Sequence, residues 1–156
     1  GLLGRGASAQ TVARALKMMD ADVRFYSRTR KRGLEKAQGY QYQELHRLLQ
    51  ECDIICSCLS KNVKLLYEEE FALMGENKIL FNTALSPCFD QKAIEKWLEK
   101  DNTWYFCDTL MGLGEERLLN RENVFCQKRS SGMTKQKSVE IYKKIVGNLL
   151  ATIELL

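Results

Sequence analysis

A glycine-rich turn near the N-terminus is the first group of residues whose types and spacing could do chemistry. It follows a short apolar pair and comes just before an amphipathic stretch that begins at Thr11. Between a strand and a helix, such glycines permit a tight turn, and the backbone N–H groups of the helix N-terminus attract a pyrophosphate. The sequence therefore predicts a dinucleotide-binding loop, with a glycine-rich turn that binds no ligand as the alternative. The predicted loop consists of Gly4, Arg5, Gly6, Ala7, Ser8 and Ala9.

The end of the next predicted strand carries a hydroxyl side chain and three cations. NAD-specific sites have an acidic residue at this place, which binds the ribose hydroxyls. Here there is no carboxylate to repel a 2′-phosphate, and arginine side chains can hydrogen-bond and neutralise one. NADP(H) is thus the expected nucleotide, while NAD(H) remains possible because Arg30 and Lys31 could equally begin a solvated helix face. The segment reads Ser27, Arg28, Thr29, Arg30, Lys31.

Short apolar runs alternate with amphipathic stretches of helical period along the chain. This alternation is typical of a parallel sheet covered by helices, so we expect an α/β fold with a Rossmann-type, doubly wound, mostly parallel sheet and helices on both faces. The carboxyl ends of such strands share one edge, where ligands bind. The expected strands are residues 2–3, 23–26, 53–58, 79–82, 104–107 and 124–126, and the expected helices are 11–19, 43–50, 67–74, 91–99 and 135–150.

Length and composition fit a single domain that spans residues 1–156, with 45% hydrophobic content. Gly1-Leu2-Leu3 resembles the second half of a buried strand, so we expect a truncated first strand with further chain before it. The net charge of +4 is scattered over every segment, which disfavours nucleic acid as a partner. We expect no membrane span, no secretory signal and a cytoplasmic location, because the sequence lacks long apolar runs and a basic N-terminal stretch.

Six cysteines and one histidine could also react. Cys56 and Cys58 alternate along an apolar strand without a C-x-x-C pair, so we expect no metal site and reduced thiols. Cys58 and Cys88 are expected near the ligand-binding edge, where a cation could lower the pKa of a thiol; small apolar packing is the alternative. His46 lies on a predicted surface helix, which disfavours a catalytic role.

Several segments follow one another at intervals that together are specific: Gly1 to Gly6 with Val12-Ala13-Arg14, Tyr26-Ser27-Arg28, Glu51 to Ile55, Glu70 to Met74, Ile79 to Ala84, Asp108, and the last helix with Gly147 to Leu150. They resemble the nucleotide-binding domain of D-isomer-specific 2-hydroxyacid dehydrogenases. The resemblance implies hydride transfer between a nicotinamide cofactor and a 2-keto or 2-hydroxy acid. It also implies a homodimer and a separate substrate domain, which this chain lacks.

The resemblance further implies cofactor contacts beyond the glycine-rich loop. The end of a central strand would lie against the nicotinamide ribose, and an aspartate after the following strand resembles the residue that takes the carboxamide. A loop after the strand at 53–58 resembles the segment that lines the adenosine and its ribose, although serine replaces the usual proline; an ordinary polar loop is the alternative. In the same order, these residues are Asn82, Thr83 and Ala84, then Asp108, then Leu59 and Ser60.

The positions that match the catalytic residues of the family carry other side chains. Leu85 stands where an arginine would hold the substrate carboxylate, and an aliphatic group cannot make that contact. Leu113 stands where the glutamate is expected, although Glu115 or Glu116 could substitute for it. Arg129 stands in the place of the histidine and cannot act as a general acid or base near neutral pH.

Three functions are consistent with this pattern. The first is an NADP(H)-dependent oxidoreductase of altered chemistry, in which Arg129 or Lys128 binds the substrate anion, since the cofactor carries the difficult step. The second is a non-catalytic nucleotide-binding or regulatory module that has lost its acid–base groups. The third is a structural role at a homodimer interface. The cations in the predicted cleft loops favour the first.

Overall fold

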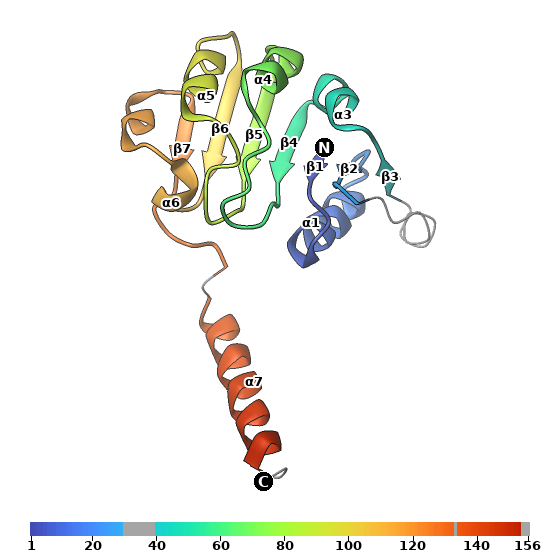
Figure 1. Ribbon diagram of the computed structural model, residues 1–156, viewed down its shortest axis with the longest axis vertical. Helices are drawn as coiled ribbons and strands as arrows, with labels where there is room; N and C mark the ends of the chain where they lie inside the picture. The colour runs from blue at the N-terminus through green and yellow to red at the C-terminus, as the bar shows by residue number, and fades with distance from the viewer. Residues whose placement is uncertain (30–39, 133, 154–156) are drawn as a thin grey trace.

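A seven-stranded parallel sheet forms the body of the chain, in the order β3-β2-β1-β4-β5-β6-β7 (Figure 1). The computed structural model describes residues 1–29, 40–132 and 134–153. The strands are β1 (Leu2–Leu3), β2 (Arg24–Tyr26), β3 (Gln41–Tyr42), β4 (Ile54–Ser57), β5 (Lys78–Asn82), β6 (Thr103–Cys107) and β7 (Val124–Cys126). All neighbouring strands pair in parallel, which confirms the predicted Rossmann-type sheet.

Helices follow most strands, as crossover connections between parallel strands require. They are α1 (Ala7–Met18), α3 (Leu45–Glu51), α4 (Glu68–Met74), α5 (Gln91–Trp97), α6 (Leu110–Leu113) and α7 (Lys135–Ile153), with a 3₁₀ helix η1 (Glu116–Asn120). None of the helices in the described ranges is long and apolar enough to span a bilayer.

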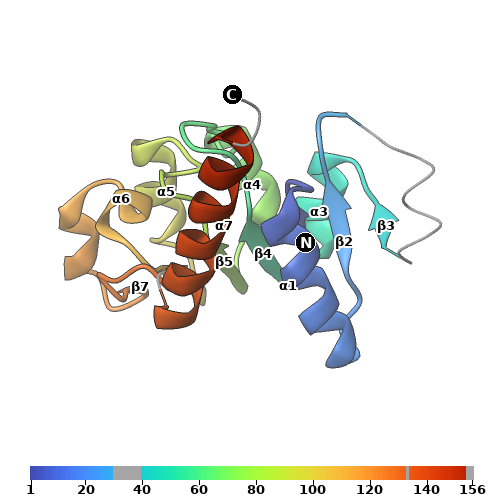
Figure 2. The same cartoon turned by 90° about the horizontal axis from the view of Figure 1, so that it is seen from below.

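Two hydrophobic clusters hold helices to opposite faces of the sheet. The larger cluster packs α3, α4 and α5 against one face, with Leu80, Trp97 and Tyr105 fully buried or nearly so. The smaller cluster packs α1 against the other face through Ala13, next to Leu2 and Phe25. Successive strand residues point to opposite faces, so alternate side chains serve the two clusters. Figure 2 shows α1 and the α3–α5 layer on the two sides of the strands.

The outer parts of the sheet are less covered than its centre. Phe81, Phe106 and Phe125 stack across β5, β6 and β7, with ring centroids 4.9 and 5.0 Å apart, and Phe125 stays 49% exposed. The final helix α7 extends away from the sheet below its carboxyl edge (Figure 1). Its apolar side chains are exposed too, including Tyr142 at 69% and Leu149 at 59%.

The predicted strands and long helices all occur, with ends that differ by a few residues. Helix α1 begins at Ala7 rather than at residue 11, so part of the glycine-rich loop is already helical. Three short elements were not predicted, namely β3, α6 and η1. Each has at most five residues, which is too short for a hydrophobic period to show in the sequence.

Candidate nucleotide site at the carboxyl edge

The strand order reverses direction between β1 and β4, and the loops that leave these two strands enclose a cleft. From β1 the chain winds outward through β2 to β3, and it then returns to β4 on the other side of β1. In open parallel sheets, ligands bind at such a switch point, outside the carboxyl ends of the strands. The cleft has a volume of about 380 Å³ and is lined by Gly4, Arg5, Gly6, Gln10, Tyr26, Ser27, Arg28, Thr29, Cys58, Leu59, Ser60, Val63 and Leu65.

The turn after β1 brings the backbone close to its neighbours and leaves the start of α1 open. Gly4 has φ of +105°, and a Cβ atom there would lie 2.8 Å from the carbonyl oxygen of Cys58. Its amide donates to the carbonyl of Tyr26 at 2.9 Å, which ties the turn to β2. At Gly6 a Cβ would meet no atom within 4 Å, so the space above the turn is free. No side chain of the described residues caps the N-terminus of α1, so its first N–H groups can bind an anion.

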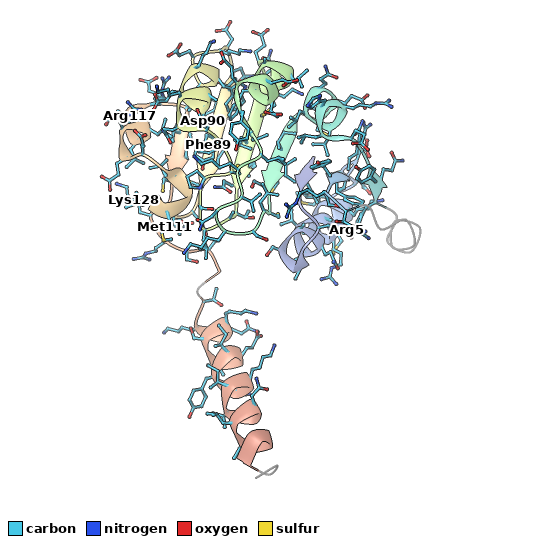
Figure 3. The ribbon with its side chains drawn as sticks, in the orientation of Figure 1. Arg5, Phe89, Asp90, Met111, Arg117 and Lys128 are labelled. Atoms are coloured by element: carbon cyan, nitrogen blue, oxygen red, sulfur yellow. The ribbon has the colours of Figure 1, made fainter. Side chains whose placement is uncertain are left out.

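Cations border the cleft on the β2 side. Arg28 is exposed and lines the cleft, and the hydroxyl of Ser27 donates to the carbonyl of Thr29 at 3.0 Å, which shapes the turn that carries it. The guanidinium of Arg5 lies 4.9 Å from the ring centre of Phe25, and Figure 3 shows Arg5 beside the start of α1. Arg30 and Lys31, the other two predicted cations, fall outside the described residues.

The loop after β4 forms the opposite wall of the cleft. Cys58, Leu59 and Ser60 line it together, as do Val63 and Leu65 further along the loop. The amide of Cys58 donates to the carbonyl of Leu3 at 2.8 Å, which joins this wall to the end of β1. The sequence prediction placed Leu59 and Ser60 here but missed Val63 and Leu65, because a loop leaves no periodic signal.

The half-buried thiol of Cys58 lies at the border of the smaller hydrophobic cluster, beside one sulfur atom and one hydroxyl group. Its Sγ atom is 3.9 Å from that of Cys56 and 3.5 Å from Oγ1 of Thr83. Hydrogen bonding from Cys56, and less so from Thr83, lowers the pKa of Cys58 to about 7, against the opposing effect of burial. The same pairing and burial raise the pKa of the Cys56 thiol. Of the two thiols, Cys58 is therefore the one that loses its proton more readily.

A smaller hollow of about 220 Å³ opens at the ends of β5 and β6, on the far side of Thr83 from the cleft wall. Asp108 is one of the residues that line it, and its two carboxylate oxygens differ in their hydrogen bonds. Its Oδ2 accepts from the amide and the hydroxyl of Ser131, at 3.0 and 2.9 Å. Its Oδ1 is buried and has no hydrogen-bond partner among the described residues, which is costly unless a ligand donates to it.

Asn82 lines the smaller hollow together with Thr83 and also holds the turn that follows β5. Its side chain is 2% exposed, donates to the carbonyls of Ser86 and Gly112 at 3.0 and 3.1 Å, and accepts from the amide of Ala84 at 3.1 Å. The hydroxyl of Tyr105 also donates to Gly112, at 2.7 Å. Asn82 thus fixes the turn through Ala84, and Thr83 joins this hollow to the wall of the cleft at Cys58.

The positions considered for catalysis differ in how exposed their side chains are and in what they contact. Leu113 is fully buried in the larger cluster, whereas Leu85 is 52% exposed on the loop after β5. Arg129 is exposed, and its amide donates to the carbonyl of Asp108 at 2.8 Å, so its backbone is fixed at the end of β6. Of the two possible glutamates, Glu115 forms an ion pair with Arg117 at 2.7 Å. His46 lies on α3, 55% exposed, and not at this edge of the sheet.

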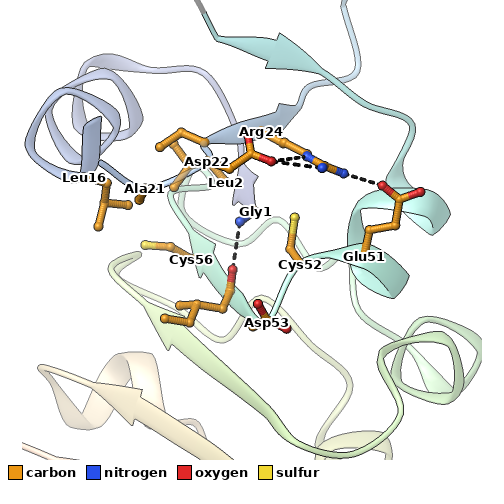
Figure 4. A pocket seen from close by; sticks show the side chains of 12 residues that line it. Gly1, Leu2, Leu16, Ala21, Asp22, Arg24, Glu51, Cys52, Asp53 and Cys56 are labelled. Carbon is orange, nitrogen blue, oxygen red and sulfur yellow. Dashed lines mark hydrogen bonds and ion pairs between the residues drawn. The ribbon is translucent and has the colours of Figure 1, made fainter. Parts of the chain in front are cut away.

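A third hollow lies at the opposite, amino end of the sheet (Figure 4). It has a volume of about 270 Å³, between the starts of β2 and β4. Arg24 pairs there with Asp22 at 2.9 Å and with Glu51, and the backbone nitrogen of Gly1 donates to the carbonyl of Ile54 at 2.8 Å. Because its charged groups already pair with one another, this hollow offers little to an anionic ligand.

Comparison with known proteins identifies the family. A family model described as the NAD-binding domain of D-isomer specific 2-hydroxyacid dehydrogenases matches residues 1–127. Glyoxylate reductase of Aeropyrum pernix is 29% identical over 161 residues, which cover 97% of this chain and 47% of that protein. Glyoxylate reductase of Pyrococcus furiosus is 34% identical over 103 residues, or 64% of this chain and 31% of that protein. The chain thus spans less than half the length of these two relatives.

Solved structures agree on the fold. D-lactate dehydrogenase of Aquifex aeolicus, solved with NAD and lactic acid, has a TM-score of 0.81 and 21% identity, and the match covers 99% of this chain and 53% of that one. A dehydrogenase of Polaromonas has a TM-score of 0.84 and 18% identity, and the match covers 99% of this chain and 50% of that one. At such identities the likeness concerns the fold alone. On its sequence match, the chain belongs to the D-isomer-specific 2-hydroxyacid dehydrogenase family, of which it is the NAD-binding domain.

Proposed function

We propose that the cleft between the β1, β2 and β4 loops holds the pyrophosphate and adenosine half of NADP(H). The observation that carries this proposal is the uncapped N-terminus of α1, which opens into the cleft behind a glycine turn that has no room for a side chain at Gly4. Backbone N–H groups from Gly6 to Ala9 would bind the pyrophosphate. Leu59 and Ser60 would line the adenosine and its ribose.

The choice of NADP(H) over NAD(H) depends on the loop after β2. Arg28 is the described cation that lines the cleft there, and none of the described residues that line the cleft is acidic. A guanidinium group binds a phosphate through paired, charge-assisted hydrogen bonds. Ser27 and Thr29 would add hydroxyl contacts to the 2′-phosphate. We therefore expect Arg28 to set the preference for the phosphorylated cofactor.

The hollow at Thr83 and Asp108 fits the nicotinamide end. The buried and unpartnered Oδ1 of Asp108 can accept a hydrogen bond from a carboxamide N–H. Thr83 and Ala84 would lie against the neighbouring ribose, on the turn that Asn82 fixes. When bound, a nicotinamide dinucleotide supplies the hydride-transfer chemistry.

For the full-length protein we propose an NADP(H)-dependent oxidoreductase that acts on a 2-keto or 2-hydroxy acid. Lys128 and Arg129 support this proposal, because both are exposed cations at the end of β7, and Arg129 is fixed to Asp108 through its backbone. Either could bind the substrate carboxylate in place of the arginine that Leu85 replaces. The proton would then come from a group outside this chain.

A second candidate is a nucleotide-binding module without catalytic activity. It is favoured by Leu85 and Leu113, since neither leucine can bind a carboxylate or move a proton. The two candidates differ in one readout. The full-length protein either oxidises bound NADPH when glyoxylate or another 2-keto acid is added, or it binds NADPH without turnover. Turnover would reject the second candidate, and inactivity over a broad panel of 2-keto acids would reject the first.

We further propose that the full-length protein is a cytoplasmic homodimer. The support is the family membership, together with the apolar side chains that α7 and the outer strands leave exposed. Sedimentation of the full-length protein tests the dimer, and a monomer at micromolar concentration would contradict it.

The nucleotide preference is tested by fluorescence titration of NADPH and NADH. We expect Arg28→Ala to weaken NADPH binding by roughly tenfold, as for the loss of one charge-assisted hydrogen-bonded pair, and to leave NADH binding nearly unchanged. Arg14→Ala, which removes an exposed arginine of α1 that does not line the cleft, is the matched control. Tighter binding of NADH than of NADPH by the unmodified protein would contradict the preference.

A further inference from the structure

Two of the six cysteines, Cys56 and Cys58, lie side by side where β4 ends, and Cys58 is part of the wall of the nucleotide cleft. All six lie in the described part of the chain, and all are free thiols. Cys58 and Cys126 are half-buried, whereas the others are buried. Of these two, Cys58 alone lines the 380 Å³ cleft. Cys58 thus combines access from the cleft with a second thiol, Cys56, whose sulfur atom is 3.9 Å away.

The local structure favours reaction at Cys58 and a supporting role for Cys56. The hydroxyl of Thr83 is 2.8 Å from the carbonyl of Ser57 and 3.5 Å from the sulfur of Cys58, so it can turn its proton to a thiolate at Cys58. Cys56 points to the same face, two residues earlier, and is 8% exposed. A reagent that enters the cleft therefore meets Cys58 first, and Cys56 is the thiol placed to react next.

We propose that Cys58 is a peroxide-sensitive thiol and that Cys56 resolves its oxidised form as a disulfide, which switches nucleotide binding off. The thiolate of Cys58 attacks one oxygen of hydrogen peroxide, the O–O bond breaks, and a sulfenic acid and hydroxide form. The thiol of Cys56 then attacks the sulfur of Cys58 and displaces its hydroxyl group. Overall the two thiols lose two electrons and two protons, and the peroxide is reduced to two water molecules.

The disulfide would act on the cleft through the backbone. The sulfur atoms must close from 3.9 Å to about 2.05 Å, so Cys58 must move at the end of β4. The carbonyl oxygen of Cys58 packs so closely on Gly4 that a Cβ atom there would be only 2.8 Å from it. The amide of Cys58 donates to the carbonyl of Leu3. A shift of Cys58 is therefore transmitted to the turn that would hold the pyrophosphate. This effect on binding rests on the proposed function, whereas the thiol chemistry does not.

The thiol chemistry is tested on the reduced chain without nucleotide. The chain is treated with equimolar hydrogen peroxide, blocked with N-ethylmaleimide and digested after Arg47 and Lys61, which releases residues 48–61 with three cysteines. We expect this peptide to lose the mass of two hydrogens and to take up one maleimide, at Cys52. Cys58→Ser should abolish the loss, and Cys56→Ser should leave a sulfenic acid at Cys58 that dimedone traps. Cys126→Ser is the matched control and should behave like the unmodified chain.

Other outcomes would overturn the proposal. A disulfide between Cys107 and Cys126, which are paired in register across β6 and β7, without one at Cys56 and Cys58 would place the reactive pair elsewhere. The proposal would also be overturned if Cys58→Ser, with its fold intact by circular dichroism, still lost the mass of two hydrogens from this peptide.

The effect on binding is measured separately, with NADP⁺ so that the nucleotide is not itself a reductant. We expect saturating NADP⁺ to slow the oxidation at least tenfold, and the oxidised chain to bind NADP⁺ at least tenfold more weakly until dithiothreitol restores it. Equal binding by the oxidised and reduced chains would overturn the switch. If the reduced chain does not bind NADP⁺, the proposed function fails and the switch with it, while the peroxide result still decides the thiol chemistry on its own.

Discussion

At the scale of single residues, the carboxylate of Asp108 has one oxygen that is fixed by hydrogen bonds and one that can still accept a hydrogen bond. One carboxylate oxygen is held by Ser131, and the other is buried without a partner among the described residues. Burial of an unpaired acceptor costs about 1–3 kcal/mol, so a ligand that donates to it recovers that free energy on binding. The aspartate therefore marks one end of the candidate site by energetics as well as by position.

We expect Asp108→Ala to weaken binding of the intact dinucleotide. We expect the Kd of NADPH to rise roughly tenfold, because the carboxamide loses its acceptor. The Kd of 2′-phospho-ADP-ribose, which lacks the nicotinamide, should stay within about twofold, since the pyrophosphate cleft is untouched. Calorimetric titration measures both. Equal weakening for the two ligands would mean that Asp108 acts on the fold and not on the nicotinamide.

The thiol of Cys58 gives a pH-dependent prediction. Thr83 helps to lower its pKa, since a hydroxyl hydrogen bond stabilises the thiolate. Alkylation of Cys58 by iodoacetamide should therefore rise with pH through about 7, the pKa to which this thiol is lowered. Thr83→Val removes the hydroxyl, raises the pKa and moves the half-maximal rate to higher pH. A pH profile that is the same with and without Thr83 would contradict this role of the hydroxyl.

At the scale of elements, the turn between β1 and α1 depends on a backbone conformation that favours glycine. Gly4 combines φ of +105° with a close approach to the carbonyl of Cys58. Gly4→Ala should lower the free energy of unfolding by about 1–3 kcal/mol and abolish detectable NADPH binding, because the wall of the cleft must move. Gly6→Ala is the control for the fold, since it meets no atom within 4 Å and should cost much less stability. Urea unfolding of the two variants compares them, and equal losses would contradict the argument.

A buried lysine stabilises the end of α3. Lys78, at the start of β5, is 8% exposed and donates to the carbonyls of Gln50 and Cys52 at 2.8 and 2.7 Å. These carbonyls lie at the helix C-terminus, where intrahelical partners are missing and a cation is favoured. Lys78→Met should cost about 1–3 kcal/mol of unfolding free energy in urea, because it leaves both acceptors unsatisfied. Lys100→Met, at an exposed lysine, should change stability by less than about 0.5 kcal/mol.

The elements also show what the sequence could predict and what it could not. The central strands were predicted closely because each is a run of apolar residues, as in Ile54–Ser57 and Lys78–Asn82. The edge strand Gln41–Tyr42 has two residues and one exposed side chain, so it carries no such signal. The loops after β1 and β2 were predicted from residue types at strand ends, whereas Leu59 and Ser60 were expected from the family resemblance. Val63 and Leu65 were not predicted, because their position depends on how a loop folds back.

At the scale of the whole molecule, the sheet presents hollows at both ends, and the two ends differ in chemistry. At the carboxyl edge, Arg28 is exposed, and among the described residues no side chain caps α1 and none is hydrogen-bonded to the buried Oδ1 of Asp108. At the amino edge, Arg24 is already paired with Asp22 and Glu51. The division follows from the parallel arrangement, which collects all loops of one kind at one edge. We therefore expect a dinucleotide to bind at the carboxyl edge of the sheet and not in the hollow at its amino edge.

The most direct test is amide hydrogen exchange of the chain with and without saturating NADPH. We expect slower exchange in residues 4–9, 58–65 and 82–84, which form the carboxyl edge, and unchanged exchange in residues 21–24 and 51–54 at the amino-edge hollow. Protection confined to the amino-edge hollow, or no protection anywhere with NADPH or NADH, would contradict the placement of the nucleotide at the switch point of the sheet.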